Sequence, residues 1–140
     1  MANSQGRMRT NYFRVTDVER FKEIIAKVQG HEGEEVITFN KTIDGETFYG
    51  FGCTAQLQGY YDDEAEEYSY DAFLDDLQTV VTPGDAVVIM EISYEKLRYI
   101  SASAIIVTSE RTESMDFAQL VLKKAAEVVG NPDYRTKIEY

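Results

Sequence analysis

Few residues of this chain could perform chemistry. The 140 residues include one histidine, His31, and one cysteine, Cys53. A structural zinc site needs several Cys or His ligands, so these two cannot build one. His31 falls in a glycine-flanked segment that we predict to be a surface loop, and Cys53 falls in an apolar strand. A Cys53–His31 nucleophilic pair is formally possible, but a packed, unreactive thiol is the favoured interpretation.

Residues 50–55 (Gly-Phe-Gly-Cys-Thr-Ala) match the phosphate-binding pattern G-x-G-x-x-A only formally. In that motif the glycines open a helix whose N-terminus holds the phosphate. Here they fall inside a predicted strand, and polar and acidic residues follow, so a phosphate would meet carboxylates. The sequence contains neither a G-x-S-x-G nucleophile elbow nor an H-E-x-x-H zinc motif. We therefore predict a non-enzymatic protein without a cofactor or a bound metal.

The acidic residues are the most informative group, because they are concentrated in the middle of the chain. The formal net charge is −11, yet the segment Thr42–Glu95 contains 13 acidic residues and no Lys or Arg. Eight of the 13 lie between Asp62 and Asp76. At a Debye length of about 8 Å, neighbouring carboxylates are only partly screened from one another. Such a run lowers stability unless a cation or a basic surface neutralises it.

Three interpretations of this acidic run stay open. The first is a solvated loop that keeps the protein soluble. The second is a docking surface for a basic protein, because carboxylates at alternate strand positions lie about 6.6 Å apart, close to the repeat of phosphates along a nucleic-acid strand. Interleaved tyrosines would add interface anchors. The third is a Ca²⁺ or Mg²⁺ site, although the spacing lacks the alternating ligands and central Gly of an EF-hand. The candidate partner-binding residues are Tyr61, Asp62, Asp63, Glu64, Glu66, Glu67, Tyr68, Tyr70, Asp71, Asp75 and Asp76.

The charge and the cysteine content also bear on partners and location. A net charge of −11 repels both nucleic acid and anionic lipid. No stretch reaches the roughly 20 apolar residues of a membrane span, and the N-terminal residues lack the apolar run of a secretory signal. A single cysteine cannot form an internal disulfide, which suits a reducing compartment. We expect a cytoplasmic protein with a basic protein partner, no membrane and no direct nucleic-acid binding.

The elements that would position these residues follow from hydrophobic periodicity and turn signals. We expect one α+β domain over residues 1–140, with residues 1–9 as a flexible tail and an antiparallel sheet of five or six strands with three helices. The polar segment Gln56–Ser69 is expected to connect two of these elements. The expected helices span residues 17–27, 70–80 and 115–129, with Phe117, Leu120, Val121, Ala125 and Val128 of the last facing the core. The expected strands span residues 10–15, 35–41, 47–55, 86–93 and 98–108, and residues 134–140 could add an edge strand.

A helix followed by a hairpin occurs twice, about 52 residues apart, which indicates a duplicated helix–hairpin unit. Aligning the two hairpins places Gly50, Gly52, Ser101 and Ser103 on one sheet face. Small residues in a strand allow close approach of another element or of a ligand. Tight internal packing is the favoured interpretation. A small-molecule or nucleotide site on this Gly/Ser face is the alternative function.

Three segments resemble small acidic proteins of phages and conjugative elements of Gram-positive bacteria. They are residues 10–15 (Thr-Asn-Tyr-Phe-Arg-Val), 95–99 (Glu-Lys-Leu-Arg-Tyr) and 130–134 (Gly-Asn-Pro-Asp-Tyr). The resemblance spans nearly the whole chain and carries over no catalytic or binding residue. It implies a mobile-element context, in which small acidic proteins inhibit host defence nucleases by imitating nucleic acid. By this analogy the acidic run would act as a nucleic-acid mimic.

Overall fold

The computed structural model describes residues 5–96 and 99–134. Its larger sheet is antiparallel and contains six strands, which lie in the spatial order β3-β4-β1-β7-β8-β9. Their bounds are β1 (Gln5–Thr10), β3 (Ile37–Ile43), β4 (Glu46–Cys53), β7 (Val87–Glu95), β8 (Tyr99–Val107) and β9 (Thr112–Asp116). A smaller sheet, in the order β2-β5-β6, contains β2 (Val28–Gly30), β5 (Leu57–Asp62) and β6 (Glu67–Ser69).

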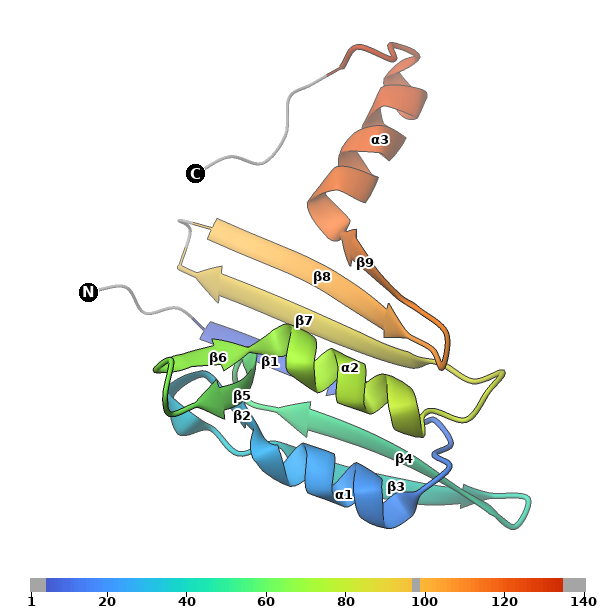
Figure 1. The fold of residues 1–140 in the computed structure, drawn as a ribbon. Helices are drawn as coiled ribbons and strands as arrows, with labels where there is room; N and C mark the ends of the chain where they lie inside the picture. The colour runs from blue at the N-terminus through green and yellow to red at the C-terminus, as the bar shows by residue number, and fades with distance from the viewer. Residues whose placement is uncertain (1–4, 97–98, 135–140) are drawn as a thin grey trace.

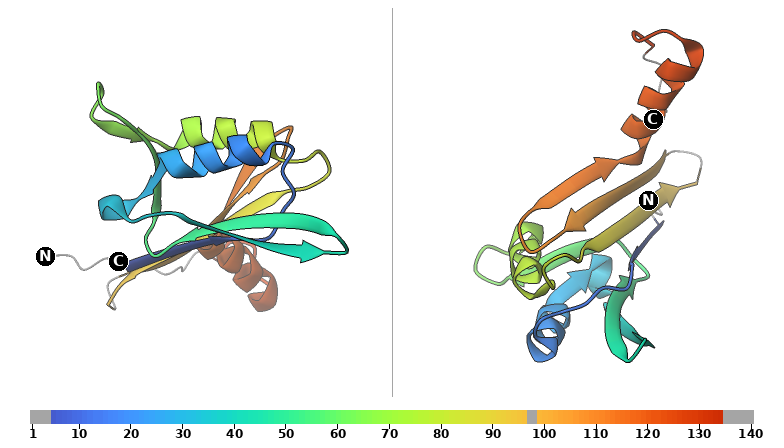
Figure 2. Two further views of the ribbon diagram at one scale, coloured as in Figure 1. Left: turned by 90° about the horizontal axis from the view of Figure 1, so that it is seen from below. Right: turned by 90° about the vertical axis from the view of Figure 1, so that its right-hand side faces the viewer.

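Three α-helices lie within the described residues, and they do not share one side of the large sheet. Helices α1 (Val18–Lys27) and α2 (Tyr70–Val80) lie side by side over one face, which we call the inner face. Helix α3 (Phe117–Val129) projects on the other side, which we call the outer face (Figures 1 and 2). The expected α+β class, with three helices and a six-stranded antiparallel sheet, is confirmed.

Local sequence signals account for the first two helices and the first hairpin. Asp17 caps α1 by accepting a hydrogen bond from the Arg20 amide at 3.0 Å, and Ser69 caps α2 by accepting one from the Ala72 amide at 3.1 Å. Asp44 and Gly45 both have positive φ angles, 50° and 79°, as a two-residue hairpin turn requires. These elements agree with the sequence predictions.

An aromatic cluster forms the core between the inner face and helices α1 and α2. Phe13, Phe21, Phe51 and Phe73 are fully buried. Phe13 contacts Phe21 and Phe51 edge to face, with ring centroids 5.7 and 6.1 Å apart, and Phe51 contacts Phe73 in the same way at 6.1 Å. Edge-to-face pairs add to the free energy gained from burial. The cluster therefore joins the N-terminal segment, both helices and β4 into one core.

The predicted flexible tail is wrong for residues 5–9, because they belong to strand β1. This strand lies between β4 and β7, in the middle of the sheet. Its inward residues are Gly6, Met8 and Thr10, while the side chains of Arg7 and Arg9 point outward. Only one inward residue is strongly apolar, so the alternation did not resemble a buried strand. Residues 1–4 lie outside the described part of the chain.

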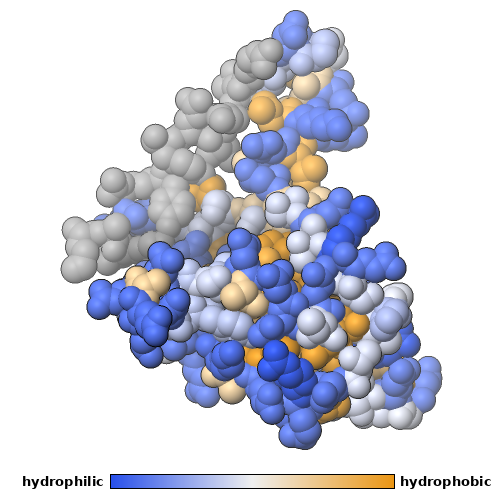
Figure 3. All heavy atoms as spheres, in the orientation of Figure 1, coloured by the Kyte–Doolittle hydropathy of each residue, from blue (hydrophilic) through white to orange (hydrophobic). Residues whose placement is uncertain are grey.

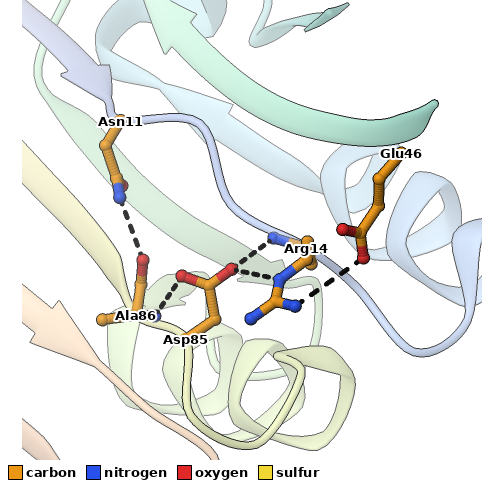
Figure 4. Close-up of polar contacts among 5 residues, drawn as sticks. All are labelled: Asn11, Arg14, Glu46, Asp85 and Ala86. Atoms are coloured by element: carbon orange, nitrogen blue, oxygen red, sulfur yellow. Dashed lines mark hydrogen bonds and ion pairs between the residues drawn. The ribbon is translucent and has the colours of Figure 1, made fainter. Parts of the chain in front are cut away.

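A polar junction fixes the loop before β7 to the segment before α1 (Figure 4). The Asp85 carboxylate accepts hydrogen bonds from the Arg14 amide at 2.9 Å and from the Arg14 guanidinium at 3.1 Å. Burial alone would raise the pKa of Asp85, but the bonds from the Arg14 and Ala86 amides and from the guanidinium outweigh burial and lower it. Asn11 donates to the Ala86 carbonyl at 3.0 Å and accepts from the Val88 amide at 2.8 Å.

The last helix differs from its prediction in two ways. Residues 112–116 form strand β9 at the edge of the sheet, so α3 begins at Phe117 instead of residue 115. The expected inward stripe of Phe117, Leu120, Val121, Ala125 and Val128 is not buried, since none of the 13 residues of α3 is. Of the predicted edge strand over 134–140, Tyr134 is not in a strand, and the remainder lies outside the described residues.

The order of helices and hairpins along the chain is the same in both halves of the large sheet. Helix α1 precedes the β3–β4 hairpin and α2 precedes the β7–β8 hairpin, and the two hairpins flank β1. The duplicated helix–hairpin unit nevertheless stays a prediction.

In the described part of the chain, no helix has both the length and the apolar character needed to cross a membrane.

Candidate protein-docking surface

The acidic run lies on an ordered β-hairpin, which we call the acidic hairpin (β5, β6 and the turn between them, residues 57–69). The polar connection expected over residues 56–69 is therefore largely a pair of strands. Strand β5 also pairs with β2, so the hairpin is held by a third strand along its β5 side. Gly59 has a φ of 103°, and a Cβ there would collide with the Ser69 backbone. This glycine permits the close approach of the two strands.

The turn of the acidic hairpin holds its carboxylates in defined positions. The Asp62 side chain accepts hydrogen bonds from the Glu64 amide at 3.0 Å and from the Ala65 amide at 3.3 Å, as in an Asx turn. Glu66 has a positive φ of 53°. Asp62 pairs directly with Glu67 across the hairpin, so two like charges face each other. Such a pair destabilises a sheet.

Two tyrosines of the acidic hairpin form an exposed pair. Tyr61 lies directly opposite Tyr68, with ring centroids 5.1 Å apart. They are 42% and 38% exposed, and the Tyr68 hydroxyl donates to the Gln29 side chain on β2 at 3.2 Å. The pair is therefore oriented by contacts within the protein while its rings remain accessible. Such rigid, accessible aromatic groups are frequent at the centres of protein interfaces.

Helix α2 extends the acidic surface beyond the hairpin. β6 leads straight into α2, and the two follow one another across the front of the molecule (Figure 1). Asp71 and Asp75 are exposed and lie four residues apart, hence on one side of the helix. We use the name acidic surface for the exposed carboxylates of hairpin and helix. They are Asp62, Asp63, Glu64, Glu66, Glu67, Asp71 and Asp75.

Asp76, a predicted partner-binding residue, instead makes contacts within the protein. Its carboxylate accepts a hydrogen bond from the Tyr60 hydroxyl at 2.8 Å and forms an ion pair with Arg20 of α1 at 3.3 Å. Burial and the Asp76 carboxylate together raise the pKa of Tyr60. Lys27 lies over the Tyr60 ring, 4.4 Å from its centroid. These contacts from α1 anchor the acidic surface, and local sequence carried no signal for them.

Tyr70, another predicted partner-binding residue, also faces the interior. Its hydroxyl is buried and has no hydrogen-bond partner among the described residues. Burial, together with the nearby Glu91 carboxylate, raises the pKa of Tyr70. The ring contacts Phe73 edge to face at 6.0 Å. The side chain of Tyr70, at the start of α2, thus packs against the core.

The predicted common Gly/Ser face does not form. Gly52 has the same orientation as Arg9 and Met90, on the outer face, whereas Ser103 has the same orientation as Met8 and Glu91, on the inner face. Gly50 therefore lies on the outer face with Gly52, and Ser101 lies on the inner face with Ser103, because residues two apart in a strand share a face. Phe39 packs over both glycines. The prediction failed because β1 lies between the hairpins and sets their relative register.

Neither the single cysteine nor the single histidine is part of the acidic surface, although His31 contacts Gln58 of the acidic hairpin. Cys53 is buried on the inner face of β4 as a free thiol, and burial raises its pKa. This agrees with the predicted packed thiol. His31 is exposed in a short 3-10 turn, η1 (His31–Gly33), and its Nδ1 lies 2.9 Å from the Gln58 amide nitrogen. Within residues 5–96 and 99–134, no three His, Cys, Asp or Glu side chains gather as metal ligands would.

Comparison of the chain with protein-family models, curated proteins and solved structures finds no match. The resemblance to phage and conjugative-element proteins therefore stays a prediction.

Proposed function

We propose that this chain is a non-enzymatic binding protein whose acidic surface docks on a basic surface of a partner protein. The observation that carries the proposal is the ordered acidic hairpin. It presents five exposed carboxylates within six residues, Asp62 to Glu67, in a 54-residue stretch, Thr42–Glu95, without a single Lys or Arg. Because Asp62 and Glu67 face each other at a cost in stability, a basic partner would relieve repulsion that the free protein retains.

The order of the acidic hairpin favours docking over mere solubility. A surface that is already folded loses less conformational entropy on binding than a flexible loop. The Tyr61–Tyr68 pair supplies accessible aromatic area beside the charges, and tyrosine is enriched among residues that dominate binding energies. A solvated tail would need neither feature.

The finer form of this proposal is nucleic-acid mimicry. The spacing along a strand that the sequence suggested is not formed, because the carboxylates from Asp62 to Glu67 gather around the hairpin turn. What supports mimicry is the density of negative charge on an ordered element, and the predicted mobile-element context favours a host nuclease or another defence enzyme as the partner. On this proposal, the protein and an oligonucleotide compete for the same basic surface. The protein acts in the cytoplasm, where such enzymes meet invading nucleic acid.

The proposal is tested by capture from nuclease-treated host lysate. The test variant replaces five carboxylates by amides: Asp62→Asn, Asp63→Asn, Glu64→Gln, Glu66→Gln and Glu67→Gln. The control variant neutralises five exposed acidic residues elsewhere and so has the same net charge: Glu32→Gln, Glu35→Gln, Asp44→Asn, Glu110→Gln and Asp133→Asn. We expect a basic protein that wild type and control retain and the test variant loses, with retention falling steeply as salt is raised.

Equal loss from both variants would mean that only net charge matters, and would contradict a specific docking surface. Equal retention by both would place the interface elsewhere. Displacement of the captured protein by excess single- or double-stranded oligonucleotide is the result expected for nucleic-acid mimicry. A captured protein that no oligonucleotide displaces would leave docking in place and overturn mimicry.

A further inference from the structure

The outer face and α3 together expose an unusual amount of apolar surface. Fourteen large hydrophobic residues of the described chain are strongly exposed, and ten of them lie on α3 and on the outer face of β7, β8 and β9, at 41% to 77% exposure. Figure 3 shows such residues along α3 at the top of the molecule. The ten are Met90, Ile92, Tyr94, Ile100, Met115, Phe117, Leu120, Val121, Val128 and Val129.

An apolar groove lies within this surface, between α3 and the ends of β7 and β8. It encloses about 460 Å³. Ile92, Tyr94 and Ala102 line it from the outer face, and Phe117, Val121 and Ala125 line it from one side of α3. Lys123 and Glu127 lie on the opposite side of the helix, whereas Lys124 lies seven residues after Phe117 and so borders the apolar side. No charged residue of α3 lines the groove itself.

Burial does not stabilise α3 as it stabilises the other helices. Asp116 caps its start by accepting a hydrogen bond from the Ala118 amide at 3.1 Å, and Gly130 ends it in the left-handed conformation. A helix of 13 residues is nevertheless marginal in water without tertiary packing. Its apolar side thus requires a covering surface.

The exposed area matches the size of one half of a stable dimer. Large hydrophobic side chains present on the order of 150 Å² each when fully exposed, so these ten residues leave on the order of 800 Å². The largest apolar patch on a typical monomer is about 300–600 Å². A standard interface buries about 800 Å² per partner.

The distribution of charge points to a second copy of the chain as the covering surface. The acidic hairpin and α2 lie on the inner side, whereas α3 lies on the outer side (Figure 2). The charged residues of the outer face beside this surface include Arg7 and Arg9 on β1, which are basic, and Glu113 on β9, which forms an ion pair with Arg111 at 3.9 Å. Two copies that meet through their outer faces keep their acidic surfaces apart, which an approach from the inner side would not.

We propose that the chain forms a two-fold symmetric homodimer through α3 and the outer face of β7 and β8. A two-fold contact needs a self-complementary surface, and here the apolar side of α3 from one copy covers the outer face of the other. The dimer leaves both acidic surfaces free. This inference does not depend on the proposed function, because it rests on the apolar surface and uses the acidic one only for its position.

The test measures the mass of the full chain by sedimentation equilibrium across a dilution series. We expect twice the 16.0 kDa chain mass at high concentration, with dissociation on dilution. Val121→Asp places a carboxylate in the groove and is expected to give a monomer at every concentration. Gln119→Asp adds the same charge at an exposed position of α3 away from the groove, and is expected to remain dimeric.

Circular dichroism keeps the test decisive, because Val121 is exposed and its replacement should leave the core intact. A folded monomeric Val121→Asp variant beside a dimeric Gln119→Asp variant supports the proposal. A wild-type protein that stays monomeric throughout the series overturns it. A Val121→Asp variant that stays dimeric also overturns it, since the interface would then lie elsewhere.

Discussion

Helices α2 and α3 both begin at a capping residue and both carry an apolar stripe, but only the stripe of α2 is buried. Helix α2 buries Phe73, Leu74, Leu77 and Val80 against the inner face and α1, whereas α3 buries none of its residues. The two helices differ mainly in the elements that precede and hold them. Helix α2 follows the acidic hairpin, which is held by β2, while α3 follows β9, an edge strand of the large sheet.

The comparison separates two kinds of information in a hydrophobic pattern. The period identifies which side of a helix is apolar, and it did so for both helices. It does not identify what covers that side, because the covering surface comes from distant residues or from another molecule. A prediction that an apolar stripe faces the core of its own chain is therefore an assumption, and α3 violates it.

The largest expected effect comes from deleting a buried leucine in α2. Leu77→Ala should lower the free energy of unfolding by about 2–5 kcal/mol, because Leu77 is fully buried and its loss leaves a cavity. The matched change in α3, Leu120→Ala, should lower it by less than about 0.5 kcal/mol in the monomer, because Leu120 is 45% exposed.

Both changes are measured by urea unfolding at a concentration where wild type is monomeric. Equal losses from the two variants would show that α3 is packed in the monomer, and the contrast between the helices would be lost. A Leu120→Ala effect that grows with protein concentration would instead sharpen the contrast, because association would then supply the packing.

Much of the fold could be predicted from sequence, because local signals are strong there. Asp17, Ser69 and the Asp44-Gly45 turn each act over a few residues, and the elements that they begin were predicted closely. Strand β1 was missed over residues 5–9, and the strand predicted over residues 10–15 was wrong beyond Thr10, where only Phe13 and Val15 form isolated bridges. Gly6 and Thr10 do not resemble inward residues, because whether they suit the interior depends on the groups that they face. The Phe51 amide, for example, donates to the Thr10 hydroxyl at 3.0 Å.

The candidate site could be predicted in composition but not in geometry. The carboxylates from Asp62 to Asp75 are exposed, as a run of acidic residues suggests. That Asp76 pairs with Arg20 and that the Tyr70 hydroxyl is buried depend on the packing of α1, α2 and β5, which no local pattern specifies. The relative faces of Gly52 and Ser103 likewise depend on β1, a strand distant from both in sequence.

A smaller effect is expected at Glu91, on the packed side of the sheet beneath the acidic hairpin. Burial raises the pKa of Glu91, although its carboxylate accepts a hydrogen bond from the Leu57 amide at 3.0 Å. The folded state therefore holds the proton more tightly than the unfolded state, and stability falls as pH rises from the ordinary range of a glutamate, about 4.3, through the raised value.

Glu91→Gln removes this cost and can still accept the Leu57 bond. We expect the variant to melt at a higher temperature than wild type at neutral pH, with a difference that disappears as pH falls below about 4. Thermal unfolding followed by circular dichroism across pH provides the measurement. Glu127→Gln on α3 is the control and should show little difference at either pH. A Glu91→Gln variant that is less stable than wild type at neutral pH would contradict the inference that burial of the charged Glu91 carboxylate lowers stability.

The smallest effect expected lies in the acidic hairpin, where Glu67 faces Asp62. Glu67→Gln removes one of two opposed like charges, so we expect the free energy of unfolding to rise by about 0.2–1 kcal/mol at low salt and by less at high salt. Glu110→Gln, at an exposed position in the loop before β9, is the matched control. If the acidic surface docks on a basic partner, the same Glu67→Gln change should weaken capture of that partner while it stabilises the free protein. Opposite signs for stability and binding are what a functional surface predicts, because its charges are retained against a cost in folding. If the acidic run serves only solubility, Glu67→Gln should raise the stability of the free protein and have no effect on binding.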